Sequence, residues 1–297
     1  MTARDFEGYG RHPPDPRWPG GARGGAKLAL NFVINHEEGG EESFPDGDPR
    51  SETALTEGST APVKGRDLAA ESMFQFGSRV GFWRLHRLFT ERALPCTVFA
   101  VARALERTPQ AATAIREAGW DVAGHGLKWE MHAGMDEALE RARIAEATSL
   151  IERVVGQRPL GWYTRYAASE NTRRLLAEAG YLYDSDAYDD ELPYWRQVAG
   201  RPHLVLPYSL AHNDLRFQRA ALTTGEEFTA YIRHACELML TEPGGRMLSV
   251  GLHNRIIGHA GRASGLAKLL DWVASQPGIW VCRRLDIARH WAAEHPP

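Results

Sequence analysis

Two kinds of apolar pattern alternate along the chain. Runs rich in apolar and β-branched residues predict short β-strands, and the first of them covers residues 28–34. Apolar residues spaced three and four positions apart predict helices, as at residues 80–92. Further strands are expected at 97–101, 122–123, 161–163, 181–183, 204–207, 247–252 and 279–282, and further helices at 135–155, 171–179, 226–240, 266–274 and 286–293.

This alternation of strand and helix predicts parallel strands joined by crossover helices. Seven or eight such units favour an α/β barrel over an open doubly wound sheet, and no GxGxxG follows the first strand. We expect one catalytic domain over residues 27–297. Residues 1–26, rich in Gly, Pro and Arg, are expected to form an extended arm that does not pack. The polar stretch 39–71 is expected to be a long loop that serves as a lid or an oligomer contact.

The composition narrows the classes of function. The chain has 297 residues, 43% of them hydrophobic, and a net charge of −3, so nucleic-acid binding has no electrostatic support. No apolar run is long enough to cross a membrane, and the N-terminus has no apolar core of a signal peptide. The three cysteines, with no CxxC pair, indicate neither a disulfide framework nor a zinc knuckle. We expect a cytoplasmic protein that acts on a small molecule and forms a homo-oligomer, a dimer or a tetramer.

Polar residues follow most of the predicted strands. Glu37 and Glu38 end the first one, and because like charges repel, one of them is expected to hold its proton to a higher pH than the other. In a barrel the strand ends meet at one rim, which predicts an active site there. The set suits hydrolysis of an amide-like C–N bond, in which a carboxylate activates water and a second acid protonates the departing nitrogen. The rim candidates include His36, His125, Tyr163, Arg165, Asp184, Arg216, His253, Asn254 and Arg255.

Several of these residues stand in recognisable motifs. The stretches Asn35-His36-Glu37-Glu38-Gly39 and Gly124-His125-Gly126-Leu127-Lys128-Trp129 resemble the polysaccharide deacetylase (NodB homology) superfamily, as does Ser249-Val250-Gly251-Leu252-His253. The closer likeness is to its PuuE-type, metal-independent allantoinase branch, and it runs from about residue 4 to 291. The resemblance implies a distorted (β/α)7-type barrel and a hydrolase of C–N bonds other than peptide bonds.

The resemblance also implies roles. Glu37 matches the general base, Glu38 and His125 match metal-binding positions of deacetylases, and His253 matches the late histidine that often serves as general acid. Trp129 stands where the second metal-binding histidine falls, and tryptophan cannot ligate zinc. We therefore expect no required cofactor. Zinc is the alternative, with Glu38, His125 and His36 as its ligands.

The chain departs from the branch at four places. His36 replaces the usual Tyr, Gly124 the usual Ser and Asn254 the usual Cys, and residues 165–171 are one residue longer. These changes are expected at the rim, and they favour ring-opening of a small cyclic amide, imide or ureide other than allantoin. A metal-dependent N-deacetylase of an amino sugar or small amide and a non-catalytic ligand-binding barrel are the alternatives. The expected substrate contacts are His36, Trp129, Trp162, Tyr163, Arg165, Asp184, Arg216, Asn254 and Arg255.

Overall fold

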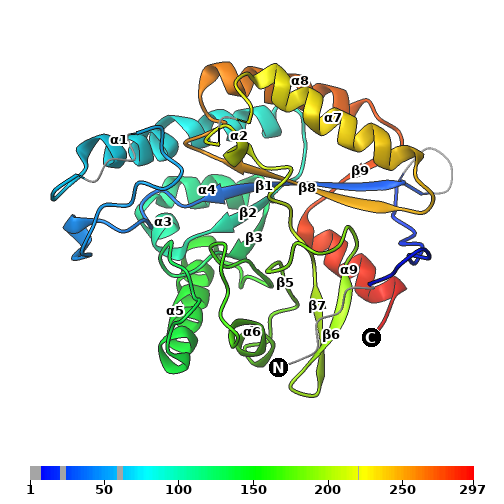
Figure 1. Ribbon diagram of the computed structural model, residues 1–297, viewed down its shortest axis with the longest axis horizontal. Helices are drawn as coiled ribbons and strands as arrows, with labels where there is room; N and C mark the ends of the chain where they lie inside the picture. Colours follow the sequence, from blue (N-terminus) through cyan, green and yellow to red (C-terminus); the bar gives the residue numbers. More distant parts are fainter. Residues whose placement is uncertain (1–7, 21–24, 59–62, 220) are drawn as a thin grey trace.

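A parallel sheet built around one fully buried strand organises the molecule. The computed structural model describes residues 8–20, 25–58, 63–219 and 221–297 (Figure 1). Strand β1 (Leu28–His36) pairs with β8 (Arg246–His253) on one side and with β2 (Thr97–Ala100) on the other. The remaining strands are β3 (Asp121–Gly124), β4 (Gly161–Trp162), β5 (Tyr183–Asp184), β6 (Tyr194–Val198), β7 (Arg201–Val205) and β9 (Ile279–Val281).

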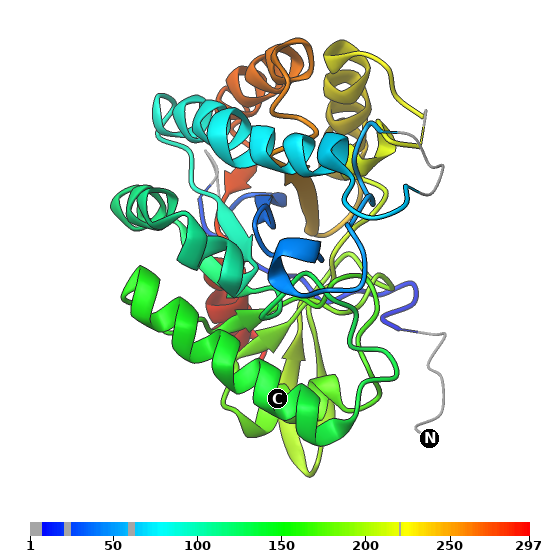
Figure 2. The ribbon, with the colours of Figure 1, turned by 90° about the vertical axis from the view of Figure 1, so that its left-hand side faces the viewer.

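The strand order is β6-β7-β5-β4-β3-β2-β1-β8, and β9 pairs with the first residues of β1. All pairs are parallel except β6 with β7. The sheet curls strongly, with helices on its outer side (Figures 1 and 2). These are α1 (Leu68–Phe76), α2 (Phe82–Thr90), α3 (Ala102–Arg107), α4 (Pro109–Glu117), α5 (Glu137–Val155), α6 (Thr172–Glu178), α7 (Gly225–Thr241) and α8 (Ala260–Ala274). Helix α9 (Arg284–Glu294) instead packs against Ala29 and Met247, on the inner face of the curl.

The curled sheet is open between its two edge strands, β6 and β8. Within the described residues these two strands share no ladder, and the irregular stretch 206–213 fills the seam. A single parallel bridge joins Asn213 to Gly251, whose N–H donates to the carbonyl of His212 at 2.9 Å. The prediction of a distorted α/β barrel is therefore confirmed, in the form of an open half-barrel.

Alternation along β1 separates the inside of the curl from the outside. Val33 packs inward with Phe99, Ala123, Tyr163 and Tyr208. The intervening residues Leu30, Phe32 and Ile34 pack outward in the large core beneath the helices. Because side chains alternate along a strand, Asn35 and Glu37 continue the inward set, and His36 continues the outward one.

Several elements differ from the sequence expectation. Helix α1 begins at Leu68, inside the stretch expected as loop, and a π turn (Gly77–Gly81) joins it to α2. Helices α3 and α4 and strand β6 were not expected. Strand β6 is half-exposed at the edge of the sheet, so its residues lack the apolar run that marks the buried strands.

The expectation that the N-terminal arm does not pack is wrong. Its described part contains no helix or strand, yet the Trp18 side chain is buried. The Trp18 indole donates to the carbonyl of Arg246 at 2.9 Å, and its ring lies 6.1 Å from that of Trp291 on α9. Residues 1–7 and 21–24 of the expected arm lie outside the described residues. No helix in the described parts of the chain is long and apolar enough to cross a membrane.

A buried arginine ties the inside of the curl together. Arg284, the first residue of α9, is fully buried and donates to Asn31 on β1 at 3.1 Å and to Ser249 on β8 at 2.7 Å. It also donates to Ser185, after β5, at 2.8 Å and to the carbonyls of Leu206 and Pro207 in the seam. One side chain therefore links β1, β5, β8 and the seam.

Replacing Arg284 by methionine is expected to lower the free energy of unfolding by about 3 kcal/mol, because several buried acceptors then lose their donor. Urea unfolding measures this difference. Arg289→Met on the exposed face of the same helix is the control and is expected to change stability by less than about 0.5 kcal/mol. Equal effects of the two substitutions would contradict the role given to Arg284.

Candidate active site

Two adjacent carboxylates lie buried where β1 ends. Glu37 and Glu38 are 1% and 2% exposed, and the Arg255 guanidinium lies between them. Its Nη1 is 2.8 Å from Glu37 Oε2 and 3.2 Å from Glu38 Oε1. Burial alone would raise the pKa of Glu37, but Arg255, followed by His253 and His125, outweighs burial and lowers it. Repulsion between the carboxylates therefore does not govern Glu37, which is ionised near neutral pH.

Two histidines direct their Nε2 atoms at the same oxygen of Glu37. His125 Nε2 lies 3.2 Å from Glu37 Oε1, and His253 Nε2 lies 3.6 Å from it. His125 Nδ1 donates to the carbonyl of Tyr163 at 2.7 Å, which places a proton on that nitrogen. His253 Nδ1 lies 2.6 Å from Asp214 Oδ1. Burial alone would lower the pKa of His253, but the negative charges of Asp214 and Glu37 outweigh burial and raise this pKa, so the ring keeps its proton to a higher pH than a free imidazole.

A cavity of about 180 Å³ lies over these groups. Its floor is polar and is formed by Asn35, Glu37, His125, Asn213 and His253. Its walls are mostly aromatic or aliphatic and include Leu55, Trp129, Tyr163, Tyr208, Leu210 and Leu215. Arg165, Tyr166 and Arg219 complete the lining. The cavity therefore presents acid–base groups at its base and apolar surface around them.

Part of the expected 39–71 loop lies over this cavity. Ala54 and Leu55 line it, and the Leu55 carbonyl accepts a hydrogen bond from Arg255 Nε at 3.0 Å. Glu52 forms an ion pair of 2.7 Å with Arg165, whose guanidinium stacks 3.6 Å from the centre of the Trp129 ring. Two loops far apart in the sequence thus meet across the cavity.

Several predicted contact residues lie behind the cavity and do not line it. His36 points outward, with its ring 5.4 Å from that of Phe82 on α2. Trp162, next to Tyr163 on β4, also packs in the core beneath the helices. Both follow from strand alternation, which places neighbours on opposite faces.

Asp184, Arg216, Asn254 and Arg255 are also absent from the lining. Asp184 is paired with Arg173 on α6 at 2.7 Å. Arg216 lies 4.8 Å from the ring of Tyr231. Asn254 donates to Glu38 Oε2 at 2.8 Å and contacts His36 Nδ1 at 3.3 Å, so two of the departures from the family motif touch each other.

Gly124, a third departure, also faces away from the cavity. A Cβ at Gly124 would lie 2.4 Å from Trp162, so the glycine makes room for that ring. Of the four departures, only the 165–171 stretch lines the cavity, through Arg165 and Tyr166. The expectation that all four lie at the substrate rim is therefore wrong.

Sequence reasoning gave no site role to several residues that the structure places in the site. Asn35, Leu210, Leu215 and Arg219 line the cavity. Tyr208, Asn213 and Asp214 were expected only as polar groups at a strand end; the first two line the cavity and Asp214 orients His253. Alternation along β1 could have found Asn35, which is two residues before Glu37. Residues 208–219 follow β7 with no strand and only a 3₁₀ turn at Asp214–Arg216, so no periodicity shows their direction.

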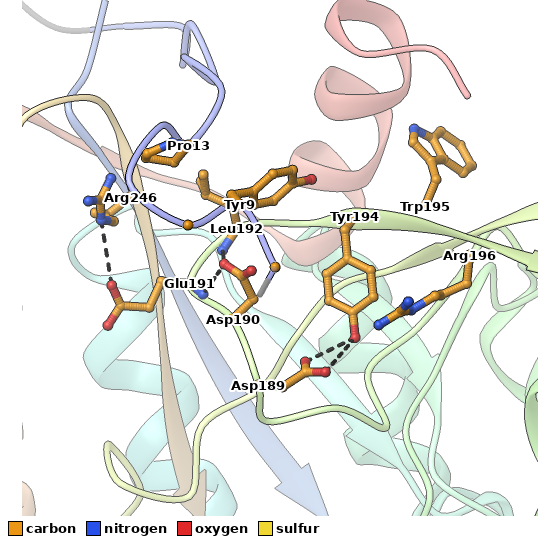
Figure 3. Close-up of a pocket in the computed structure, with 12 residues that line it drawn as sticks. Tyr9, Pro13, Asp189, Asp190, Glu191, Leu192, Tyr194, Trp195, Arg196 and Arg246 are labelled. Atoms are coloured by element: carbon orange, nitrogen blue, oxygen red, sulfur yellow. Dashed lines mark hydrogen bonds and ion pairs between the residues drawn. The ribbon is translucent and has the colours of Figure 1, made fainter. Parts of the chain in front are cut away.

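A larger cleft of about 760 Å³ lies between the N-terminal arm and the segment 189–196 (Figure 3). Its acidic groups already have partners, since Asp189 accepts from the Tyr194 hydroxyl at 2.9 Å and Glu191 lies 3.6 Å from Arg246. Asp190 accepts from the backbone of Leu192 at 3.0 Å. The cleft contains none of the acid–base groups described above, so the smaller cavity is the candidate site.

The residues present do not fit the metal centre that the deacetylase resemblance offers as the alternative. Asn254 and Arg255 bond the two oxygens of Glu38, and Trp129 occupies the place of a ligand. Among the described residues, no group of three or more His, Cys, Asp or Glu side chains is arranged to hold a metal ion. The absence of a required metal stays a prediction.

The sequence matches known proteins over its whole length. The model of the polysaccharide deacetylase family matches residues 66–183. A Schizosaccharomyces pombe protein, provisionally named a polysaccharide deacetylase, is 35% identical over 99% of this chain and 98% of its own length. The chain belongs to the polysaccharide deacetylase family.

Solved structures of two similar proteins superpose on the whole of this chain. A probable polysaccharide deacetylase from Pseudomonas aeruginosa PAO1 is 44% identical, with a TM-score of 0.94 over 100% of both chains. PuuE allantoinase is 42% identical, with a TM-score of 0.94 over 100% of this chain and 99% of its own. Family membership makes the chain one of a group of hydrolases that act on C–N bonds.

Replacing Glu37 by glutamine is expected to lower turnover by about 10²–10⁴-fold, because the amide keeps the shape and removes the base. Steady-state kinetics on a confirmed substrate measure the loss, and circular dichroism checks the fold. Glu178→Gln, on exposed α6, is the control and is expected to leave the rate unchanged. Full activity of Glu37→Gln would remove Glu37 from the chemistry.

The rate is expected to fall as the pH rises through the pKa of His253, because the acid role needs the protonated ring. That pKa is raised above its usual value near 6.5, so the alkaline limb lies above that value. Asp214→Asn removes a negative charge that raises the pKa of His253, so the alkaline limb of the pH–rate profile is expected to move to lower pH. The exposed Asp271→Asn is the control. An alkaline limb at the same pH in Asp214→Asn and wild type would contradict the role of His253 as the general acid.

Proposed function

We propose that this protein hydrolyses a C–N bond within a small cyclic amide, imide or ureide and opens the ring. The observation that carries this proposal is the cavity of about 180 Å³, with Glu37, His125 and His253 at its base and apolar walls above them. A pocket below the usual 300–1,000 Å³ range for ligand sites suits a small compact molecule.

The acid, His253, lies next to the base, Glu37, with its Nε2 atom 3.6 Å from Glu37 Oε1. Glu37 takes a proton from water while that water attacks the ring carbonyl, and His253 donates its proton to the departing nitrogen. Once His253 has lost its proton, one of the charges that lower the pKa of Glu37 is gone, so Glu37 holds the proton it received more firmly. The two proton transfers therefore support each other.

The walls favour a ring over a sugar polymer. Leu55, Tyr208, Leu210 and Leu215 offer apolar surface and few polar partners for hydroxyl groups. The loop residues over the cavity, held by the Glu52–Arg165 ion pair, restrict the room that a long chain would need. The two similar structures are named as a probable polysaccharide deacetylase and an allantoinase, so the test includes substrates for both reactions.

The lengthened 165–171 stretch supports a substrate other than allantoin. Tyr166 has a φ of +50°, which is unusual for a residue other than glycine, and it is 66% exposed beside the cavity. Because Tyr166 lines the cavity, this backbone conformation sets the shape of part of its wall. Arg165 is already paired with Glu52, so its charge is partly neutralised toward a ligand.

The deciding experiment is a substrate screen on protein treated with a chelator. Hydantoins, imides, lactams and allantoin are tested beside N-acetylated sugars, and mass spectrometry detects the gain of one water molecule. Ring-opening that chelation leaves unchanged, with allantoin a poor substrate, is the expected result. Tyr166→Gly serves as the pocket variant and is expected to raise KM for the best ring about 10-fold by removing wall contact.

Two results would contradict the proposal. Efficient hydrolysis of allantoin would refute the claim about specificity. Deacetylation of N-acetyl sugars alone, lost on chelation and restored by zinc, would refute ring-opening and establish the metal-dependent alternative.

A further inference from the structure

We propose that the Arg255 guanidinium is the fixed cation of this site and holds, between Glu37 and Glu38, the place that a divalent ion holds in a metal-dependent site. Arg255 is then a positioning residue that keeps the base ionised and aimed. The catalytic part of this inference rests on the proposed function, because it takes Glu37 as the base. Its structural part, the place of the Arg255 charge between the two carboxylates, does not rest on the proposed function.

The position of Arg255 is set on several sides. Its Nη1 contacts both carboxylates at 2.8 and 3.2 Å, and its Nε donates to the Leu55 carbonyl at 3.0 Å. Its side chain is 1% exposed, so solvent does not screen the attraction between its charge and the two carboxylates. The remaining nitrogen, Nη2, is buried and has no partner among the residues that the structure describes.

The tryptophan that replaces a metal-binding histidine supports this cation. The centre of the Trp129 ring lies 4.9 Å from the guanidinium carbon of Arg255, and the Phe74 ring lies 4.5 Å from it. A cation over aromatic faces gains electrostatic energy, most with tryptophan. The residue that removes a metal ligand therefore also stabilises the charge that makes a metal unnecessary.

The charges around Arg255 show why a cation is needed there. Glu37, Glu38 and Glu41 act on it from the end of β1 and the turn after it, and His253 acts on it from β8. Two buried carboxylates with no cation between them would be strongly unfavourable. A divalent ion would meet the same need, but Nη1 already contacts one oxygen of each carboxylate.

The test removes the cation and returns it from solution. Arg255→Ala is expected to lower the melting temperature, and about 10 mM guanidinium chloride is expected to raise it again by about 2 °C or more relative to sodium chloride. Wild type is expected to gain no stability from guanidinium, because Arg255 already fills the place between the carboxylates. The Glu38→Gln/Arg255→Ala double variant has one carboxylate fewer to neutralise, so it is expected to be more stable than Arg255→Ala and to respond less.

Zinc is the second probe. Arg255→Ala is expected to bind zinc at least about 10-fold more tightly than wild type in a calorimetric titration, because the two carboxylates then lack their cation and are free to bind one. Arg255→Lys keeps the positive charge and is expected to show no such gain. Equal zinc affinities of wild type and Arg255→Ala, or no response of Arg255→Ala to guanidinium, would overturn the proposal.

These measurements separate this inference from the proposed function. If Arg255→Ala does not fold alone, the yield of refolded protein with guanidinium or with zinc replaces the melting temperature as the readout, and no recovery with either overturns the proposal. If no cyclic compound is hydrolysed, the proposed function fails, while stability and zinc binding still decide the place of Arg255. On a confirmed substrate, guanidinium is expected to restore turnover of Arg255→Ala at least about 10-fold with little change in KM.

Discussion

Two neighbouring carboxylates are buried in this protein, and most of the contacts in the site offset the cost of burying their charges. Glu37 and Glu38 are almost fully out of solvent, where unpaired charges are costly. Arg255 supplies the opposite charge, and Asn254 supplies a hydrogen bond. The long helix 68–90 approaches the same point through its π turn. A Cβ at Gly77 would lie 2.5 Å from Glu38 Oε1, so only glycine allows the helix to come so close.

The same constraint explains why the chain's departures from its family lie where they do. His36 and Asn254 contact each other and, through Asn254, hold Glu38 from behind. Gly124 gives its space to Trp162. His36 and Asn254 therefore support the acid pair and Gly124 serves core packing, whereas Arg165 and Tyr166 shape the cavity itself. The departures behind the cavity and the departures in its wall therefore involve different residues.

The sequence predicted the strands whose residues are buried on both faces and the charged groups at their ends. The run 28–34 predicts β1 and places Glu37, and the strand ends similarly place His125 and His253. Strand alternation also separates Glu37 from His36, because neighbouring side chains point to opposite faces. Asp184 and Trp162 belong to strands of two residues, which are too short for a pattern to show direction.

Contacts between distant parts of the chain were beyond the reach of sequence patterns. Arg255 meets Leu55 across 200 positions, and Arg284 meets Asn31 across 253. Neither arginine stands in a periodic pattern that marks it as buried, since arginine is usually exposed. The seam between β6 and β8 has a further consequence. It contains one strand bridge, whereas β1 and β8 have eight registered pairs, so side chains take the place of a ladder there: Arg284 donates to the carbonyls of Leu206 and Pro207, and Asp214 accepts from the backbone of His253. Tyr208 and Asn213 belong to that wall, so Arg284 and Asp214 help to set the shape of the cavity without lining it.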